Sequence, residues 1–453
     1  MIVCVKTTNP EAVAAHTTVA AQRWPHLLNE LTDTVIDPHL ARPETRATTR
    51  EVIGALLAPL TTKNCWSLAQ QAGHSRPYRI QHLLSQAGMD EESLVAALRG
   101  YLTGHLGTDE VVLVVDETGD LKKGAHTVGV ARQSPPAATR PGGIPPGTTG
   151  QIENCQVAVY LAYTTPDAHA LIDHRLYLPA SWTDEPVRLR GAGVPQDVEF
   201  ATKPELARQM IHTALEHVPG AWVAGDEVCG RNPGLRSYLE QHGAGYVMEV
   251  VATDRMATPR GPLAVKELAV LVPAQGWQKR LAGTGTKGER FYDWALIDDH
   301  ADAAGVRWVL IRRNRTSGEL AFFRCYAPRA VPLSRLVAVA GRRWRVEESF
   351  AQGKNLAGLD EHQVRMWRPW HRWSLLAMVA YAFLAVCRLR ELAHRRPSSG
   401  LVALSCNEIV RLLHALFRVE HGLEHALGWS VFRRIHQTRA QRYHYRRRAL
   451  LES

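Results

Sequence analysis

Residues 111–124 have the sequence VVLVVDETGDLKKG and carry the strongest fold signal in the chain. Five aliphatic residues lead into Asp116, and a short β-branched run ended by polar turn residues predicts a strand buried on both faces. In open α/β sheets, ligands bind at the carboxyl ends of strands, so Asp116 is a candidate site residue. Because acidic residues also favour turns, a strand capped by a polar turn is the simpler alternative. Lys122 and Lys123 are candidates for phosphate contacts, or else part of an exposed turn.

The composition is that of a globular protein with an anionic partner. The chain has 453 residues, too many for one ordinary core, so two or three structural units are expected. Its hydrophobic share of 45% and charged share of 22% are ordinary. The formal net charge of +10 favours nucleic acid or another anionic surface, and an enzyme that is merely basic is the alternative.

The cysteine pattern and the apolar runs predict a cytoplasmic protein. Seven cysteines lie too far apart for a CxxC pair: Cys4, Cys65, Cys155, Cys229, Cys325, Cys387 and Cys406. This spacing gives no zinc or redox motif, and an odd count does not suit a complete disulfide framework, so a reduced compartment is expected. No signal-peptide pattern is seen at the N-terminus. The longest apolar run, residues 375–387, is shorter than the roughly 20 residues that span a bilayer and predicts a buried helix.

The first part of the chain is predicted to be helical. Apolar residues with helical spacing recur through residues 1–105. Residues 64–73 end at a glycine suited to a helix C-terminus, and residues 76–84 form a second short helix with a proline near its start. Such a pair is similar to a helix-turn-helix, whose exposed polar residues would face DNA: Arg76, Arg79, Gln81 and His82. A helical hairpin that only packs is the commoner alternative.

A second acidic residue follows a second buried strand. An amphipathic helix over residues 203–218 leads into an apolar run, 221–226, that ends in Asp226. A further helix and strand are predicted over residues 233–241 and 245–251. Strands that alternate with helices in this order form a βαβ pattern and predict an α/β fold class.

The hydrophobic pattern of the chain changes after residue 251 and again after residue 332. Alternating hydrophobicity from residue 252 to 332 predicts a β-rich insertion, with a hairpin around residues 314–318. A long helix is predicted over residues 333–355. The basic tail, residues 432–453, carries seven arginines and two tyrosines. Such a tail is usually solvated, but it could also contact nucleic acid.

Helix geometry selects a third acid from two neighbouring glutamates. Arg343, Glu347 and Lys354 are spaced four and seven residues apart, which places them within about 40° on one helix face. That face is predicted to be packed and to include Trp344, Phe350 and Ala351, whereas Glu348 turns away with Arg345, Ser349 and Gln352 and is predicted to be a surface residue. Charges on a packed face need a partner, so Glu347 is the ligand candidate. The alternative is an Arg343–Glu347 salt bridge within the helix.

Two strand acids and one helix acid suit divalent cations. Hard ions such as Mg²⁺ take oxygen ligands and keep several waters, so a few carboxylates are enough to hold them. Two such ions, roughly 3.5–4 Å apart, clamp the attacking and leaving oxygens when a phosphodiester is displaced in line. Asp116, Asp226 and Glu347 are therefore predicted to hold the metal.

The sequence resembles DDE transposases of bacterial insertion sequences. Arg343, Glu347 and Lys354 match the Tyr-x2-Arg-x3-Glu-x6-Lys signature of a large branch whose core carries a β-strand insertion, although Ala340 stands where the signature has tyrosine. Further similar phrases span roughly residues 20–390: VVDETGDLKKG, VGVARQ (128–133), ENCQVAVYLAY (153–163), LYLPASW (176–182), FATKPELA (200–207), GDEVCGRNPGLR (225–236) and GLDEHQVRMWRPWHRW (358–373).

This resemblance implies an RNase H-like mixed sheet flanked by helices. The implied parts are a helical, possibly DNA-binding N-terminal domain (1–105), the first part of the catalytic core (106–251), the β-rich insertion (252–332), the C-terminal core helices (333–395) and a basic C-terminal region (396–453). It also implies that Asp116, Asp226 and Glu347 form the catalytic triad, and that Arg343 and Lys354 contact the DNA end or its phosphates.

The implied activity is cleavage of DNA at the ends of a mobile element and strand transfer to target DNA. The implied cofactors are two Mg²⁺ or Mn²⁺ ions, and the implied partner is double-stranded DNA, bound by a homodimer or higher oligomer at the bacterial nucleoid. Two alternatives keep the same fold. One is a catalytically inactive DNA-binding derivative, and the other is a metal-dependent nuclease that cuts without joining.

Overall fold

The computed structural model describes residues 22–133, 152–258, 261–285, 288–299, 305–393, 403–416 and 420–452. The chain divides into two compact units. The helical unit comprises residues 1–94, 354–364 and 368–453, and the sheet unit comprises residues 95–353 and 365–367. The five-part division expected from the sequence stays a prediction.

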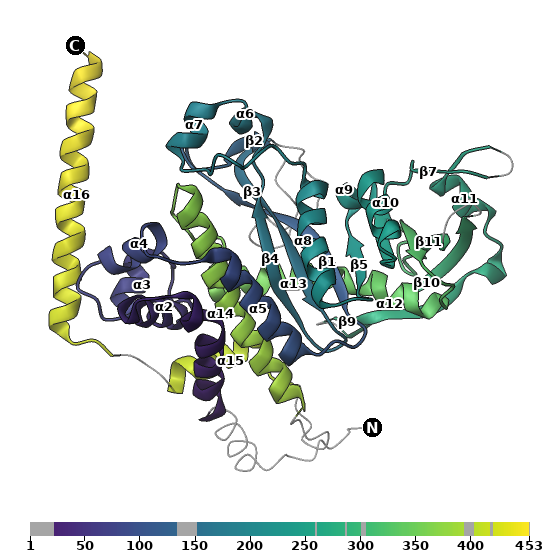
Figure 1. Cartoon of the computed structure of the whole chain (residues 1–453), viewed down its shortest axis with the longest axis horizontal. Helices are drawn as coiled ribbons and strands as arrows, with labels where there is room; N and C mark the ends of the chain where they lie inside the picture. Colours follow the sequence, from purple (N-terminus) through teal and green to yellow (C-terminus); the bar gives the residue numbers. More distant parts are fainter. Residues whose placement is uncertain are drawn as a thin grey trace. The chain divides into compact units, whose positions relative to one another are not determined.

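The sheet unit is built on a sheet to which ten of the described strands belong (Figure 1). The strand order is β2-β3-β1-β5-β6-β12-β11-β10-β9, and β4 pairs with β3 outside this path. The strands are β1 (Val112–Leu121), β2 (Ala131–Gln133), β3 (Glu153–Thr164), β4 (His169–Leu176), β5 (Trp222–Gly225), β6 (Tyr246–Val250), β9 (Gln278–Gly285), β10 (Gly288–Asp299), β11 (Val306–Arg313) and β12 (Leu320–Ala327). A small second sheet pairs β7 (Arg255–Met256) with β8 (Leu263–Ala264).

The large sheet is mixed. Strands β1, β3 and β4 form an antiparallel meander, whereas β5 runs parallel to β1, and β6 runs parallel to β5. Strand β12 pairs with β6 in the antiparallel sense, and β11, β10 and β9 continue as a second meander. The strands of the expected β-rich insertion thus extend the central sheet, and β11 and β12 form the hairpin predicted around residues 314–318. Helices flank this mixed sheet, which confirms the predicted α/β class.

Strand β1 is longer than the sequence indicates. The prediction that the strand ends in a turn at Asp116 is wrong, because β1 continues to Leu121. A ladder of ten residue pairs with β3 holds the whole strand. Such a ladder outweighs the weak strand propensity of Gly119 and Asp120. Asp116 therefore lies inside a strand rather than at its end.

Helices cover both faces of the central strands. Successive side chains of a strand point to opposite faces. Glu117 pairs with Lys203, the first residue of α8 (Lys203–His217), whereas Asp116 faces Arg343, which follows α12 (Leu333–Arg342). Consequently α8 and α12 lie on opposite faces. The other helices between residues 91 and 276 are α5 (Glu91–Leu106), α6 (Ala180–Thr183), α7 (Pro186–Gly191), α9 (Glu227–Gly230), α10 (Pro233–Gln241), α11 (Val265–Leu271) and the 3-10 helix η4 (Ala274–Gly276).

The starts of α8 and α10 are fixed by their own sequences. The backbone N–H and the hydroxyl of Thr202 both donate to Glu205 Oε2 at 2.7 Å, which satisfies a free end of α8 and lowers the pKa of Glu205. Asn232 Oδ1 accepts from the backbone N–H of Leu235 at 2.8 Å, and Pro233 follows as the first helical residue of α10. Both predicted helices are confirmed.

The long helix predicted over residues 333–355 is interrupted. Helix α12 ends at Arg342, α13 (Trp344–Ala357) begins at Trp344, and Arg343 lies at the junction. Close packing of α12 on β9 accompanies the break. A Cβ added to Gly341 would lie 1.7 Å from the backbone oxygen of Ala282, so only glycine allows this approach.

The break changes which side chains of α13 are packed. Val346, Ser349 and Phe350 are buried, whereas Trp344 is 47% exposed and Ala351 is also exposed. The prediction of a packed face containing Trp344 and Ala351 is therefore wrong, and so is the placement of Ser349 on a polar outer face. Glu348, predicted to be a surface residue, is half-buried and lies 3.4 Å from His169.

The helical unit contains the predicted pair of short helices, α3 (Cys65–Gln71) and α4 (Tyr78–Ser85). Asn64 caps α3, and Gly73 follows it with a φ of +81°, a conformation that glycine adopts without strain. The DNA contact of this pair stays a prediction. The other elements of the unit are a helix over residues 22–31, η1 (Thr32–Ile36), η2 (Asp37–His39), α2 (Pro43–Leu56), α14 (Trp367–Ala393, apart from Trp367), α15 (Cys406–Leu416) and α16 (Leu423–Glu452).

Two C-terminal segments test the remaining helix predictions. Residues 375–387 are all buried in α14, as predicted. Among the described residues, no helix has the length and apolar character needed to cross a membrane. Residues 432–452 of the basic tail form most of α16, because arginine, glutamine and alanine all favour helices, and the side chains of residues 437–448 are exposed.

Candidate active site

Asp116 and Asp226 are brought together by the register of two parallel strands. Val115 in β1 pairs with Gly225, the last residue of β5, and each aspartate comes directly after its member of this pair. The chain of β5 leaves the sheet at Asp226, which is the N-cap residue of α9. The two carboxylates therefore lie at the same level of the sheet.

Backbone donors hold one oxygen of each aspartate. Asp116 Oδ1 accepts from the N–H of Glu117 at 2.7 Å. Asp226 Oδ1 accepts from the N–H groups of Val228 and Cys229 at 3.1 and 3.2 Å. These bonds fix the orientation of each carboxylate through its Oδ1.

Arg343, at the junction of α12 and α13, connects the strand acids to the helix acid. Its Nη1 lies 3.9 Å from Asp116 Oδ2 and also 3.9 Å from Glu347 Oε1. Its Nε lies 3.0 Å from Oε2 of Glu249 in β6. A single guanidinium thus stands among three carboxylates that come from two strands and a helix.

Burial and mutual repulsion dominate the electrostatics of this cluster. Burial raises the pKa of Asp116 well above its ordinary value, and the charge of Asp226 adds to the rise, although Arg343 opposes it. Burial also raises the pKa of Glu347, against the effect of Arg343. Burial disfavours the charged form of Arg343, but the surrounding carboxylates, Glu249 first, outweigh it and raise the pKa of the guanidinium. The cluster has more negative charge than one arginine neutralises.

The sequence of the chain matches a known protein family. The model of a family described as DDE superfamily endonuclease matches residues 35–267, more than half of the chain. The chain belongs to this family. No curated protein matches the sequence closely enough to count as a relative. The matched range contains Asp116 and Asp226 but ends before Glu347, so the case for the third acid of this endonuclease rests on geometry alone.

The acidic cluster of the endonuclease has the chemistry of a divalent-cation site. Its donors are carboxylate oxygens, which Mg²⁺ and Mn²⁺ prefer, and burial together with neighbouring carboxylates raises the pKa of Asp116 and of Glu347. Within the part of the chain that the structure describes, no three acidic, histidine or cysteine side chains already converge as a closed metal cage. The guanidinium of Arg343 occupies the position between Asp116 and Glu347. A metal ion would bind both carboxylates only after displacing this guanidinium.

Sequence reasoning missed two further acids of the endonuclease. Glu249 contacts Arg343 and raises the pKa of Glu347. Burial raises the pKa of Glu227, next to Asp226, and Glu249 adds to this rise. A signal for Glu249 was present, since it is a lone acid in the apolar strand YVMEV, residues 246–250.

The predicted lysine contacts are not part of this cluster. Lys122 and Lys123 follow the end of β1, and the five residues from Asp116 to Leu121 span roughly 16 Å of strand. Lys122 lies 4.0 Å from Asp120, and Lys123 is exposed. Lys354 is 9% exposed and lies on α13, seven residues after Glu347. Their contacts with DNA stay predictions.

A buried polar network fixes α13 beside the cluster. His169 Nδ1 lies 2.7 Å from Ser349 Oγ, and Arg345 donates to Glu348 Oε2 at 2.7 Å. Burial opposes ionisation of Glu348, but hydrogen bonds from His169 and Arg345 lower its pKa to about 2. Because Ser349 is completely buried, this serine, histidine and glutamate arrangement positions α13 and does not act on a substrate.

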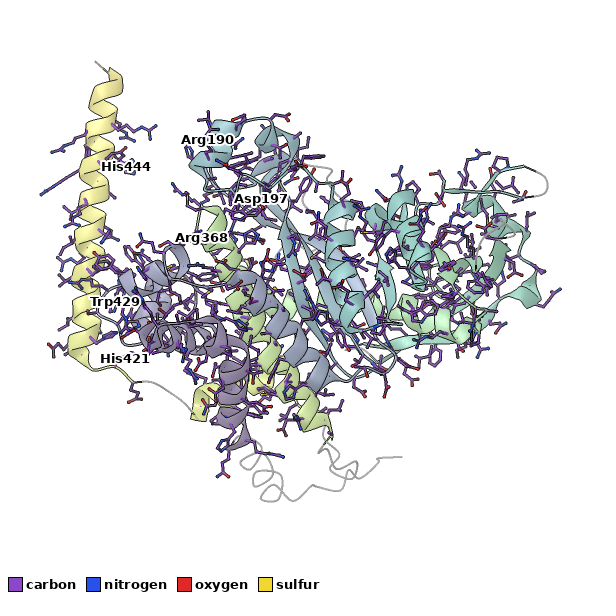
Figure 2. All side chains as sticks on the ribbon, viewed as in Figure 1. Arg190, Asp197, Arg368, His421, Trp429 and His444 are labelled. Carbon is purple, nitrogen blue, oxygen red and sulfur yellow. The ribbon has the colours of Figure 1, made fainter. Side chains whose placement is uncertain are left out.

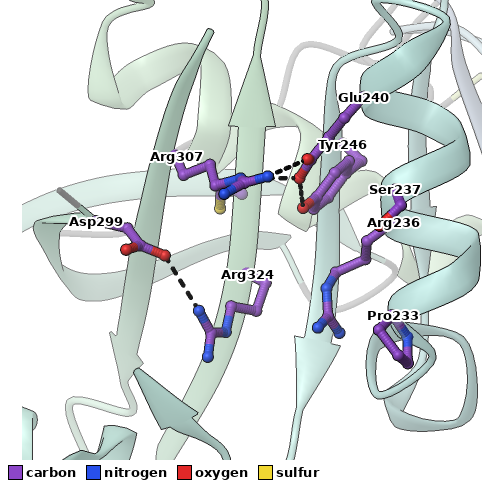
Figure 3. Close-up of a pocket in the computed structure, with 9 residues that line it drawn as sticks. Pro233, Arg236, Ser237, Glu240, Tyr246, Asp299, Arg307 and Arg324 are labelled. Atoms are coloured by element: carbon purple, nitrogen blue, oxygen red, sulfur yellow. Dashed lines mark hydrogen bonds and ion pairs between the residues drawn. The ribbon is translucent and has the colours of Figure 1, made fainter. Parts of the chain in front are cut away.

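A second charged group of the endonuclease lies around a cavity of about 180 Å³ (Figure 3). Arg307 pairs with Glu240, and Arg324 pairs with Asp254 at 2.7 Å and Asp299 at 3.2 Å. The first pair joins α10 to β11, and the pairs of Arg324 join β12 to β10 and to the turn after β6. None of the predicted site residues lines this cavity. We interpret it as a structural network.

Proposed function

We propose that this DDE endonuclease is a DNA transposase. It would cut DNA at the ends of a mobile element and join those ends to target DNA, with Asp116, Asp226 and Glu347 as the catalytic triad. The observation that carries the proposal is the position of Arg343, whose Nη1 lies 3.9 Å from both Asp116 and Glu347. This position supports the proposal because carboxylates distant in sequence face a common point where a cationic group is held.

Asp116, Asp226 and Glu347 would hold two Mg²⁺ or Mn²⁺ ions through their carboxylate oxygens, and backbone donors already orient the two aspartates. When bound, such ions lower the pKa of the attacking hydroxyl or water and neutralise charge on the reacting phosphate. In the first step, a water oxygen bonds to phosphorus and the P–O3′ bond breaks, which leaves a 3′-hydroxyl. In the second step, that 3′-oxygen attacks a target phosphodiester in line, and the target's own 3′-oxygen leaves.

The role of the protein is to position and neutralise charge. Arg343, released from Asp116 and Glu347, would pair with a DNA phosphate near the reacting bond. Lys354 would contact the DNA end, and Lys122 and Lys123 would contact phosphates farther along the duplex. A homodimer or higher oligomer would bring two ends together.

One observation favours a different outcome for the second step. Ala340 is the residue of α12 that replaces the tyrosine of the resembled signature, and alanine offers no ring to stack on a DNA end. A chain that binds the end loosely could cut without joining. The second candidate function is therefore a metal-dependent nuclease.

A cleavage assay tests these functions. The substrate is duplex DNA taken from both flanks of the gene, where a mobile element would carry inverted repeats, and it is incubated with Mg²⁺ or Mn²⁺ and with a target plasmid. Transposase activity gives both cut ends and joined products, whereas the nuclease alternative gives cut ends only. Asp226→Asn should abolish both products. Glu216→Gln, a change of an acid 60% exposed on α8, is the matched control and should leave both unchanged.

A further inference from the structure

The proximal half of helix α16, residues 423–436, contacts the short helices α3 and α4 and the turn between them. Trp429 Nε1 donates to the backbone oxygen of His74 at 2.8 Å, and Arg433 donates to Gln70 Oε1, also at 2.8 Å. The ring of Phe432 packs edge-on against Trp66 with centroids 5.1 Å apart. Figure 2 shows Trp429 on this half and His444 farther along the helix.

His425 of α16 and His421, which lies just before α16, contact the end of α3. The last residues of a helix have carbonyl groups without partners inside the helix. His421 Nε2 lies 2.8 Å from the carbonyl oxygen of Gln71, and His425 Nε2 lies 3.0 Å from that of Gln70. These contacts fix the position of the proximal half of α16 against the end of α3.

The distal half of α16, residues 437–448, is built differently. At 1.5 Å per residue this segment is about 18 Å long, and all of its side chains are exposed. It contains no acidic residue and five arginines: Arg439, Arg442, Arg446, Arg447 and Arg448. Among the described residues, none of these arginines forms a hydrogen bond or an ion pair with another side chain. The distal half is therefore a strongly cationic stretch of helix, and no described residue neutralises its positive charge.

Arginine spacing concentrates this charge. Arg439, Arg442 and Arg446 follow one another at three and four residues, which places them within about 60° of one face. Like charges three and four residues apart repel each other and destabilise a helix. An anion along this face would relieve the repulsion.

The composition of the distal half favours duplex DNA over other anionic partners. A helix that lies on a membrane needs an apolar face, but the only aliphatic residue of this segment is Ala440. A second copy of the helix would bring five more positive charges and be repelled. Duplex DNA offers regularly spaced phosphates, and arginine binds phosphate with several parallel N–H groups.

We propose that residues 437–448 of α16 bind the phosphate backbone of duplex DNA, fastened to the α3–α4 pair by the proximal half. The site rests on the proposed function in one respect, since it takes DNA as the partner of the chain. It lies outside the acidic cluster and is independent of any metal. Binding here is expected to depend on charge and not on DNA sequence.

The experiment measures how affinity for a labelled duplex changes with salt. The full chain and a variant with all five arginines changed to Gln are titrated in EDTA, so that no cutting occurs. Each phosphate that is no longer bound lowers the magnitude of the slope of log K against log salt by about 0.9, so a reduction of roughly 2.7 to 4.5 is expected for three to five lost contacts. Gln keeps helix propensity close to that of Arg, and circular dichroism verifies the fold. A chain that ends after Gln437 gives a second route to the same reduction.

Two further variants and a competing partner complete the test. The matched variant with all five arginines changed to Lys keeps the charge and should keep the slope. An unchanged slope in the folded Gln variant overturns the proposal, and so does a Lys variant whose slope falls as far as that of the Gln variant. Binding of phosphatidylserine vesicles in preference to DNA also overturns it. Metal-dependent cutting, measured in parallel on the wild type, shows independently whether the proposed function stands.

Discussion

Arg343 and Glu249 form an ion pair, with Nε and Oε2 separated by 3.0 Å, at the centre of a group of acids. Through its Nη1 the same arginine also reaches Asp116 and Glu347. The ion pair with Glu249 thus competes with the contacts that Arg343 makes to the proposed metal ligands. The balance between these contacts sets how readily a cation replaces the guanidinium.

Glu249→Gln should raise the Mg²⁺ concentration needed for binding. Without its partner, Arg343 pairs more strongly with Asp116 and Glu347 and competes with the ion. A loss of about 1 kcal/mol in the free energy of Mg²⁺ binding corresponds to a roughly fivefold weaker apparent affinity for the ion. Titration calorimetry of Mg²⁺ and Mn²⁺ measures it, with Glu216→Gln as control. Equal or tighter ion binding by Glu249→Gln would show that Glu249 does not hold Arg343 back.

Asp116→Asn should abolish DNA cleavage without destabilising the metal-free fold. The change keeps the shape of the side chain and removes one charge from a cluster of buried, repelling carboxylates. We expect activity to fall by about a hundred- to a thousandfold, as for removal of a group that acts on the transition state, and Tm in EDTA to stay equal or rise. Calorimetry and the cleavage assay give the two values. A Tm lower by several degrees would indicate a structural role for Asp116 instead.

Gly230→Ala should destabilise the protein and displace Asp226. A Cβ at this position would lie 1.8 Å from the backbone oxygen of Glu249, so α9 could no longer pack on β6. Overpacking of this kind costs about 1–3 kcal/mol. The control is Gly100→Ala in α5, where a Cβ meets nothing within 4 Å and about 0.5–1 kcal/mol should be gained. Urea unfolding compares the variants, and equal stability of the two would contradict this packing.

The thiols that the structure describes should be unreactive in the native protein. Burial raises the pKa of Cys65 and of Cys406 to about 11, and it raises the pKa of Cys155, Cys229, Cys325 and Cys387 as well. At pH 8 a thiol with pKa 11 is ionised in roughly one molecule in a thousand. Alkylation mapped by mass spectrometry should therefore label these six only after unfolding. Cys65 is only half-buried, so rapid labelling of native Cys65 would contradict the raised pKa of its thiol.

The raised pKa of the Cys65 thiol makes the free energy of unfolding depend on pH. The unfolded thiol of Cys65 ionises at its ordinary pKa of 9.0, whereas the folded thiol ionises near 11. The folded state therefore binds more protons between these values, and stability falls as pH rises from 9 towards 11. Cys65→Ala should weaken this fall, as measured by urea unfolding at pH 8 and pH 10. An identical pH dependence in both proteins would exclude the effect.

The sequence predicted the α/β class and both strand acids, because Asp116 and Asp226 each follow a short apolar run. It could not predict that β1 continues past Asp116, since that extension depends on a ladder with β3 and not on local propensity. The break at Arg343 lies next to the close packing of Gly341 on β9, a tertiary contact that the local sequence does not reveal. Glu249 was missed because only the strand order places β6 next to β5 and its acid beside Arg343.

The most direct measurement is metal-dependent cutting of duplex DNA by the wild type and by Asp226→Asn. We predict that the wild type cuts with Mg²⁺ or Mn²⁺ and not in EDTA, and that Asp226→Asn binds the same DNA with unchanged affinity in EDTA but leaves it intact. A wild type that binds DNA and cuts with neither ion would contradict the proposed triad. So would an Asp226→Asn protein that cuts as fast as the wild type.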